Sequence, residues 1–336
     1  MSVFSHPDGK IAVLITGAGG AGTIEIIQSL RAIGGYRIIA VDASEHAAGF
    51  ALADSGYVIP LATSENFMAV VGDLIGKEQP DFAIPLVDEE ILLFHRILSE
   101  YGTGKICVVA PTKEFCAAAL DKWLTFIKLR DADILTPRTS LASHADDCVF
   151  PAVIKPRDGR GSRELAYLTA PDELASYLTR APRKADCYIV QEHVAGQEYT
   201  VSVVVGLGGP TLAVVPKEVI VKRGITQVGV TRVLPEVDRL CCDIQDRLRA
   251  DGPFNVQLIM SQDRTPYVIE INPRYSTTVA LTIAAGINEV DVVIRHALGK
   301  PIEPLKFQPN LLMIRHYTQM YTSEATWPPA NVIRCV

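Results

Sequence analysis

The chain has 336 residues, of which 48% are apolar and 21% are charged, a balance that is typical of globular proteins and excludes long disorder or a collagen-like structure. Its length favours two or three compact domains. The 32 basic and 38 acidic side chains leave a net charge of −6, so no overall positive field is available for nucleic acid, and any polyanion must bind in a local pocket.

The first third of the chain alternates short apolar strands with amphipathic helices. The expected strands are residues 11–16, 37–42, 56–60, 81–86 and 105–110, and the expected helices are residues 23–33, 67–77 and 89–101. Strands that alternate with helices imply a parallel sheet covered by helices on both faces. We therefore expect a doubly wound α/β domain over residues 1–111.

A glycine loop follows the first strand. Residues 17–22 read G-x-G-x-x-G, and Asp42 ends the next strand, which is the placement of a dinucleotide-binding fingerprint. The alternative is that any doubly wound sheet needs a tight first turn. No redox residues accompany the loop, because the one Y-x-x-x-K match, Tyr101 to Lys105, contains two glycines that disfavour a helix.

After Pro111 the pattern changes to antiparallel pieces, so the second half is expected to be α+β. A helix is expected over residues 112–132, and a proline-rich tail over 300–336. Further strands are expected at residues 152–155, 165–168, 187–193, 199–206, 211–215 and 218–221, and helices at 172–180, 237–250, 277–285 and 289–298. Residues 254–260 and 267–272 predict a hairpin.

The hairpin carries the sharpest chemical signal. Glu270 and Asn272 are two residues apart on a strand and share a face, and a turn centred on residues 263–264 brings Gln257 opposite Glu270. Three oxygen-bearing side chains among apolar neighbours suit magnesium, which takes further ligands from substrate phosphate. The alternative, a polar cluster on a solvated face, fits the apolar flanks less well. Arg274 leaves the strand beside this patch, where it can meet a phosphate.

Two other segments carry polar residues of interest. Lys155 ends a buried strand and precedes a loop with Gly159, Gly161 and Ser162, which can wrap an anion or be an ordinary basic turn. Glu192 and Glu198 flank the break between two apolar strands, where they can face an adenine edge and a ribose or be surface charges.

The order of these parts resembles the ATP-grasp superfamily. The residues that carry the resemblance are Lys122, Lys155, the run Gln191-Glu192-His193-Val194, Glu198, Gln257 and Glu270-Ile271-Asn272-Pro273-Arg274. The Gln…Glu-x-Asn-Pro-Arg version is similar to the carbamoyl phosphate synthetase large-chain branch and to small single-chain ligases like it. The resemblance covers roughly residues 11–300, each motif is weak alone, and their common order is specific.

The resemblance implies the role of each residue. Lys122 and Lys155 would contact ATP phosphates, and the loop with Gly159, Gly161 and Ser162 would close over them. Glu192 and Val194 would hold adenine and Glu198 the ribose. Gln257, Glu270 and Asn272 would carry Mg²⁺, or Mn²⁺ in its place, and Arg274 would stabilise the transferring phosphoryl group, with Lys155 as its catalytic companion. The N-terminal domain would not bind NAD.

The resemblance also implies the domain organisation. An ATP-grasp domain would cover residues 112–300 with a mobile lid at about 140–210, and residues 301–336 would pack on it. The chain departs from the family in having two loop glycines where some relatives have four or five. It has one grasp unit and no glutamine amidotransferase domain, which excludes a full carbamoyl phosphate synthetase.

The expected function is an ATP- and Mg²⁺-dependent ligase that joins a small carboxylate and an amine, such as an amino acid, through an acyl phosphate. The alternatives are a kinase or carbamate-forming enzyme on the same fold, and a nucleotide-binding module, which would not need the metal patch. Arg223 is a candidate for a substrate carboxylate, against a solvated turn. Asp88 and Glu89 are candidates for an amine, against a helix N-terminus stabilised by acids.

The expected location is the cytoplasm, without a membrane or nucleic-acid partner and with homodimer formation allowed. The first ten residues are polar and form no apolar signal core. The longest charge-free stretch, between Glu198 and Lys217, is broken by glycines and a proline, so it predicts two strands and a turn rather than a membrane span. The seven cysteines form no C-x-x-C pair, which favours reduced thiols over a zinc site.

Overall fold

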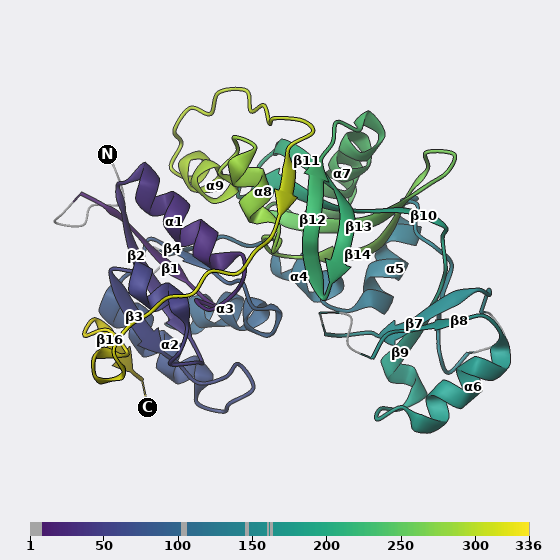
Figure 1. Cartoon of the computed structure of the whole chain (residues 1–336), viewed down its shortest axis with the longest axis horizontal. Helices are drawn as coiled ribbons and strands as arrows, with labels where there is room; N and C mark the ends of the chain where they lie inside the picture. The colour runs from purple at the N-terminus through teal and green to yellow at the C-terminus, as the bar shows by residue number, and fades with distance from the viewer. Residues whose placement is uncertain (1–8, 102–105, 145–147, 160, 162–163, 336) are drawn as a thin grey trace.

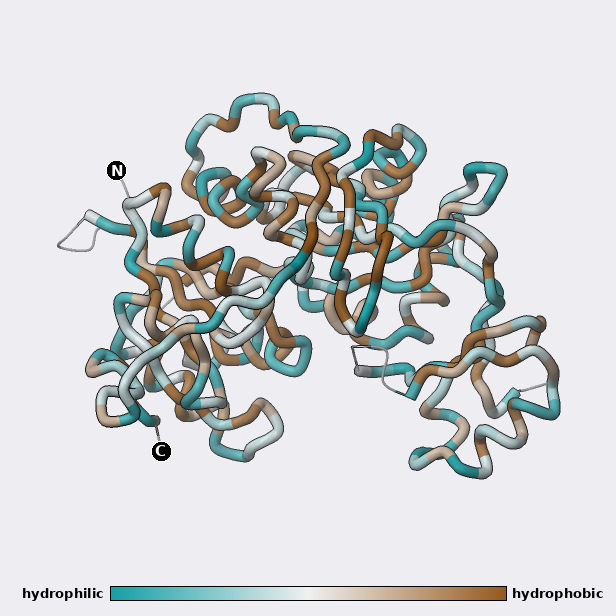
Figure 2. The backbone as a smooth tube through the Cα atoms, in the orientation of Figure 1, coloured by the Kyte–Doolittle hydropathy of each residue, from teal (hydrophilic) through white to brown (hydrophobic). Residues whose placement is uncertain are grey.

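A computed structural model describes residues 9–101, 106–144, 148–159, 161 and 164–335 (Figure 1). Three sheets organise this part of the chain, and apolar segments concentrate in their strands while the connecting loops are more hydrophilic (Figure 2). No helix among the described residues is long and apolar enough to cross a membrane. All cysteines in these ranges are free thiols.

The N-terminal sheet is parallel, with the strand order β16-β3-β2-β1-β4-β5. Its first five strands and three helices are β1 (Ile11–Ile15), α1 (Thr23–Ile33), β2 (Tyr36–Asp42), β3 (Ser55–Val58), α2 (Phe67–Glu78), β4 (Phe82–Ile84), α3 (Asp88–Tyr101) and β5 (Cys107–Val108). A short 3₁₀ turn covers Ala48–Leu52.

Strand β1 is apolar throughout because both faces of the sheet are covered by helices. Val13 and Ile15 pack with α1, whereas Ala12 and Leu14 face α2 and α3. The predicted doubly wound domain is therefore confirmed.

Two helices replace the single one expected over residues 112–132. Helix α4 (Lys113–Ala119) ends before Asp121, and α5 (Lys122–Asp131) begins after it. The Asp121 carboxylate accepts hydrogen bonds from the amides of Trp123 and Leu124, which satisfies donors that a continuous helix would bond internally. This cap fixes Lys122 as the first residue of α5.

The largest sheet of the second half has the order β14-β13-β10-β11-β12-β15, and all its pairs are antiparallel. Its elements are β10 (Gly196–Val205), β11 (Thr211–Arg223), β12 (Ile225–Thr231), α7 (Pro235–Leu248), β13 (Phe254–Ser261), β14 (Pro266–Asn272), α8 (Val279–Ala284), α9 (Glu289–Ala297) and β15 (Leu312–Ile314). Strand β12 was not expected from the sequence.

The register of the predicted hairpin is confirmed. Gln257 lies opposite Glu270, and Asn255 lies opposite Asn272. A bulge between Gln257 and Leu258 shifts the rest of the pairing but leaves these polar residues on one face.

The apolar core joins the N-terminal domain to this sheet. Ile26 and Ile27 of α1 belong to the same buried cluster as Val279 of α8 and Val290 of α9. The opposite face of the sheet packs on α4, α5 and α7. The N-terminal domain and the large sheet therefore share one buried cluster, and this close packing holds them at a fixed position relative to each other.

A small third sheet has the order β6-β9-β7-β8. It consists of β6 (Thr139–Leu141), β7 (Ala152–Pro156), β8 (Ala166–Leu168) and β9 (Tyr188–Glu192), with α6 (Pro171–Arg180) packed on it and a 3₁₀ turn at Ala185–Cys187. Its core is a separate cluster, and Figure 1 shows it to one side of the larger bodies. The expected boundary of 140–210 is too long, because β10 belongs to the large sheet.

The C-terminal tail packs on both halves of the chain rather than on the second half alone. Strand β15 pairs with β12 of the large sheet. Strand β16 (Val332–Arg334), however, pairs in parallel with β3 of the N-terminal sheet, after a 3₁₀ turn at Glu324–Thr326. Arg315 lies between them and donates to the carbonyls of Ala21, Thr226 and Thr277. The tail thus binds both bodies together, as its path in Figure 1 shows.

Candidate active site

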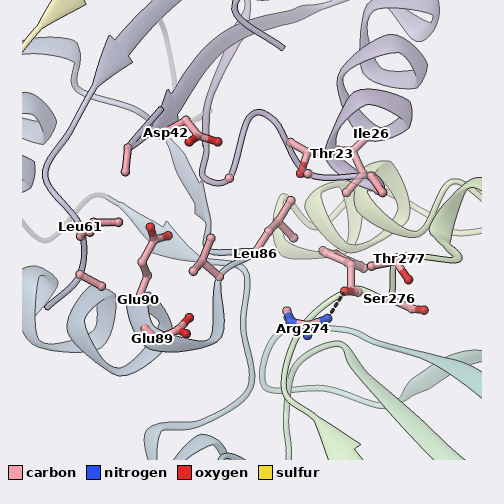
Figure 3. Close-up of a pocket in the computed structure, with 18 of the residues that line it drawn as sticks. Thr23, Ile26, Asp42, Leu61, Leu86, Glu89, Glu90, Arg274, Ser276 and Thr277 are labelled. Atoms are coloured by element: carbon pink, nitrogen blue, oxygen red, sulfur yellow. Dashed lines mark hydrogen bonds between the residues drawn. The ribbon is translucent and has the colours of Figure 1, made fainter. Parts of the chain in front are cut away.

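Two cavities lie next to each other. We call the first the lysine cleft: it has a volume of about 440 Å³ and is lined by Lys122, Lys155, Lys222, Gln257, Glu270 and Asn272, among others. We call the second the glycine-loop pocket: it has a volume of about 530 Å³ and lies between the loop at residues 17–22, the start of α3 and residues 274–277 (Figure 3). Arg274, Ser276 and Thr277 line both cavities.

Lys155 is a buried cation at the end of β7, only 6% exposed. Its Nζ donates to Gln191 Oε1 at 2.9 Å and to the carbonyl of Ile269 at 3.1 Å. Burial lowers the pKa of Lys155 to about 8, and the nearby Glu270 carboxylate opposes this shift. A phosphate in the cleft would stabilise the charged lysine and reverse part of the effect.

Lys122 connects the cleft to the loop after β7. Its Nζ donates to the carbonyl of Gly159 at 2.9 Å and lies 3.8 Å from Glu270 Oε1. Gly159 and Gly161 line the cleft with φ of 92° and 71°, in the left-handed region that favours glycine. The loop therefore needs glycine for its backbone path. Ser162 lies outside the described residues.

The predicted metal patch lies on the wall of the cleft. Gln257, Glu270 and Asn272 all line it, and Asn255 stands beside Asn272 and donates to Thr200 Oγ1 at 3.0 Å. No group of three His, Cys, Asp or Glu side chains in the described ranges is placed to hold a metal ion. The patch offers one carboxylate and two amide oxygens, which fits Mg²⁺ only together with phosphate or water ligands.

Arg274 lies where the two cavities meet. Its guanidinium is paired with both carboxylate oxygens of Asp88 at the start of α3, and both side chains are only 13% exposed. Burial works to lower the pKa of Arg274, but the carboxylates of Asp88, Glu270 and Glu89 outweigh it and raise that pKa. Asp88 is thus held by Arg274 rather than lining a cavity, whereas Glu89 lines the glycine-loop pocket.

The hairpin between β11 and β12 brings two cations to the cleft. Lys222 Nζ lies 2.5 Å from Glu198 Oε1, and Arg223 lines the cleft from an exposed position. Glu198 therefore lines the cleft, with its carboxylate paired with Lys222.

Glu192 and Val194 do not line the lysine cleft. Glu192 ends β9, and its carboxylate accepts a hydrogen bond of 3.4 Å from the amide of Arg138. The structure thus brings the two lysines, the loop glycines and the metal patch together, but not the two residues expected at adenine.

Asp42 holds the glycine loop. One of its carboxylate oxygens accepts from the Gly19 amide at 2.9 Å and the other from the Ser44 amide at 2.8 Å. At Gly22 a Cβ would lie 3.2 Å from the carbonyl oxygen of Ser276, so glycine permits the close approach of the segment that lines both cavities. These contacts give the loop and Asp42 a structural role that does not require a dinucleotide.

Sequence reasoning missed several residues that line the cleft. Asn255 precedes Gln257 by two residues on one strand, so the same alternation that found Gln257 could have found it. Lys222 adjoins Arg223 but lacked a signal of its own. Thr200, Ser276 and Thr277 reach the cleft only through the packing of the sheet and the glycine loop.

Comparisons with known proteins match both halves of the chain. Residues 184–319 match the family "ATP-grasp in the biosynthetic pathway with Ter operon", and residues 13–109 match the "PylC-like, N-terminal domain". The chain is 27% identical over 310 residues to a formate-dependent phosphoribosylglycinamide formyltransferase of Synechococcus sp. (strain RCC307), which covers 86% of this chain and 76% of the relative.

Solved structures share the fold. An ADP complex of N5-carboxyaminoimidazole ribonucleotide synthetase matches with a TM-score of 0.72 and 16% identity, covering 90% of this chain and 80% of that one. An L-amino acid ligase from Bacillus licheniformis matches with a TM-score of 0.71 and 16% identity, covering 89% and 78%.

The chain carries an ATP-grasp domain preceded by a PylC-like N-terminal domain, and the predicted resemblance is confirmed. The expected function, an ATP-dependent carboxylate–amine ligase, is consistent with these matches.

Proposed function

We propose that the lysine cleft binds the phosphates of ATP and that a carboxylate is phosphorylated beside Arg274, where the second cavity begins. The observation that supports this most is the convergence of two lysines and three oxygen-bearing side chains on one cleft that meets a neighbouring pocket. We also propose that the small sheet acts as a lid, because its buried cluster is separate from the cores of the two larger sheets.

Lys155 and Lys122 hold the phosphates. Each is a cation whose Nζ already lies among oxygen acceptors, and a phosphate charge about 4 Å away is worth about 4 kcal/mol at an effective dielectric near 20. Lys155 contributes more to this phosphate stabilisation than Lys122, because Lys155 is buried and its charge is poorly solvated in the free protein.

Gln257, Glu270 and Asn272 would hold Mg²⁺, or Mn²⁺ in its place. When bound, the ion neutralises phosphate charge. Glu270 Oε1 lies 3.8 Å from Lys122 Nζ, so this carboxylate would hold the ion while it also positions the lysine. Gly159 and Gly161, which line the cleft, belong to the loop that would close over the phosphates.

Glu192 and Val194 remain the proposed adenine contacts and Glu198 the proposed ribose contact. Because Lys222 is paired with Glu198, ribose hydroxyls must share this carboxylate with the lysine. Arg223, exposed on the rim of the cleft, is the proposed contact of a substrate carboxylate.

The reaction proceeds in two steps. A carboxylate oxygen attacks the terminal phosphorus of ATP, the bond to the bridging oxygen breaks, and ADP leaves with that electron pair. The amine nitrogen then attacks the acyl carbon, and phosphate leaves with the carbon–oxygen electron pair and a proton from the nitrogen. Arg274 supplies positive charge beside the transferring group, and the closed cleft excludes water from the acyl phosphate.

The test begins with binding. MgATP at about 100 times its dissociation constant should add about 2.7 kcal/mol to the free energy of unfolding, and NADH should add nothing. A melting shift with NADH and none with MgATP would overturn the assignment. An ADP-release screen over amino acids, singly and in pairs, with mass detection of products, then identifies the substrates.

Glu270→Ala tests the metal patch. Removing a preorganised charged group should lower turnover at least about a hundredfold, while Glu303→Ala, an exposed acid that lines neither cavity, should leave turnover unchanged. Near-normal turnover of Glu270→Ala would mean that the patch is structural.

A further inference from the structure

The glycine-loop pocket has the size of a small-molecule site. Its volume of about 530 Å³ lies within the range of roughly 300–1,000 Å³ that ligand pockets occupy. It opens onto the lysine cleft at Arg274, Ser276 and Thr277. A molecule bound here reaches the point where the proposed acyl phosphate forms.

The pocket walls are mainly apolar. Ile26 of α1, Leu86 and Val87 before α3, and Leu61 on the opposite wall all line it, and Figure 3 shows Leu61 and Ile26 on opposite sides. Leu61 is 63% exposed, although leucine is usually buried. An apolar group in the pocket would cover it.

The charged residues of the pocket are mostly acidic. Among the described lining residues, Asp42, Glu89 and Glu90 oppose the single guanidinium of Arg274, which is already paired with Asp88. Figure 3 shows the two glutamates on the wall formed by the start of α3. The pocket therefore favours a cation over an anion.

Four backbone amides of the glycine loop and the start of α1 already have hydrogen-bond acceptors within the protein. The amides at residues 18, 20 and 23 donate to backbone carbonyls, and the amide at residue 19 donates to Asp42. Phosphate sites at such loops use those N–H groups themselves. The Asp42 carboxylate would also repel a phosphate at this position.

From the size, apolar walls, acidic charge and occupied amides, we infer that this pocket binds the acceptor amine, and that the acceptor is an unphosphorylated ammonium compound with an apolar body. This deepens the proposed function and rests on it. Glu89 and Glu90 hold the ammonium group, which gives up one proton to solvent before the nitrogen attacks the acyl carbon. A phosphorylated acceptor is disfavoured by the same acids.

Three probes test the inference on the MgADP-bound protein by isothermal titration. Leucinamide has an ammonium group and an apolar side chain, N-acetyl-leucinamide lacks the charge, and O-phosphoethanolamine carries a phosphate. Leucinamide should bind at least about tenfold more tightly than either of the others, which corresponds to about 1.4 kcal/mol.

Glu89→Gln should weaken leucinamide binding about tenfold and leave MgADP binding unchanged, since Glu89 does not line the lysine cleft. Asp73→Asn, an exposed acid of the same domain on α2 that lines neither cavity, is the matched control and should change neither affinity.

Tighter binding of O-phosphoethanolamine, equal binding of N-acetyl-leucinamide, or no binding of leucinamide would overturn the inference. So would an unchanged leucinamide affinity in Glu89→Gln. In each of these cases MgADP binding by the same sample shows whether the proposed function still stands. Loss of MgADP binding in the unaltered protein would instead reject the proposed function.

Discussion

The affinity for MgATP should fall as the pH rises above about 8, because Lys155 loses its proton in the free protein. Burial lowers the pKa of Lys155 to about 8 from the usual 10.5, a difference of about 3 kcal/mol at 1.36 kcal/mol per pKa unit. A bound phosphate favours the charged lysine and raises its pKa again. The complex then holds one proton that the free protein lacks.

The direction and the size of this pH effect on affinity follow from the linkage between binding and protonation. Binding is coupled to proton uptake above the pKa of the free protein, so the affinity falls by up to about tenfold for each pH unit above about 8. Between about pH 7 and about pH 9.5 the loss should reach about thirtyfold. The second ionisation of a phosphate ester, with a pKa of about 6, lies below this window.

Isothermal titration in two buffers of different ionisation enthalpy measures both the affinity for MgATP and the number of protons taken up on binding. At about pH 9 the protein should take up close to one proton for each MgATP bound. In Lys155→Gln the affinity should be lower and the pH dependence above 8 should vanish, whereas Lys113→Gln, an exposed lysine that lines neither cavity, should behave like the unaltered protein. An affinity that is equal at both pH values, or proton uptake that persists in Lys155→Gln, would refute the reasoning.

Three further predictions concern stability and motion. Asp88→Asn should lower the free energy of unfolding in urea by about 3 kcal/mol, since Arg274 would stay largely buried without its paired charge; an unchanged midpoint would contradict this. Lys217→Met should cost about 3–5 kcal/mol, because Glu289, only 2% exposed and 4.0 Å from Lys217 Nζ, would lose its counter-charge. Adding Glu289→Gln should restore most of that loss, and a double variant as unstable as the single one would show that the pair is not the cause. MgATP should slow amide exchange in the small sheet at β7, and equal exchange with and without nucleotide would argue against a lid.

Local periodicity was sufficient to predict the metal patch. Alternation along a strand places Glu270 and Asn272 on one face, and the turn fixes Gln257 opposite Glu270, as the register confirms. The doubly wound domain followed equally from its strand–helix alternation. These features depend on residues that are close in sequence.

Long-range pairing was not predictable. Asp88 and Arg274 are 186 residues apart, and nothing near either residue indicates the other. Strand β16 adds to a sheet formed by the first 108 residues only after the tail has crossed the molecule. The pairing of Glu198 with Lys222 likewise depends on the hairpin reaching back over the cleft. Such contacts arise from tertiary packing, which overrides local patterns.

The most direct test of the central claim is the fate of carboxylate oxygen. With a substrate carboxylate labelled with ¹⁸O, an acyl phosphate intermediate transfers one labelled oxygen to the phosphate that is released together with ADP. Mass spectrometry of that phosphate should show one ¹⁸O for each amide formed. Label in AMP, or unlabelled phosphate alongside amide product, would contradict the account.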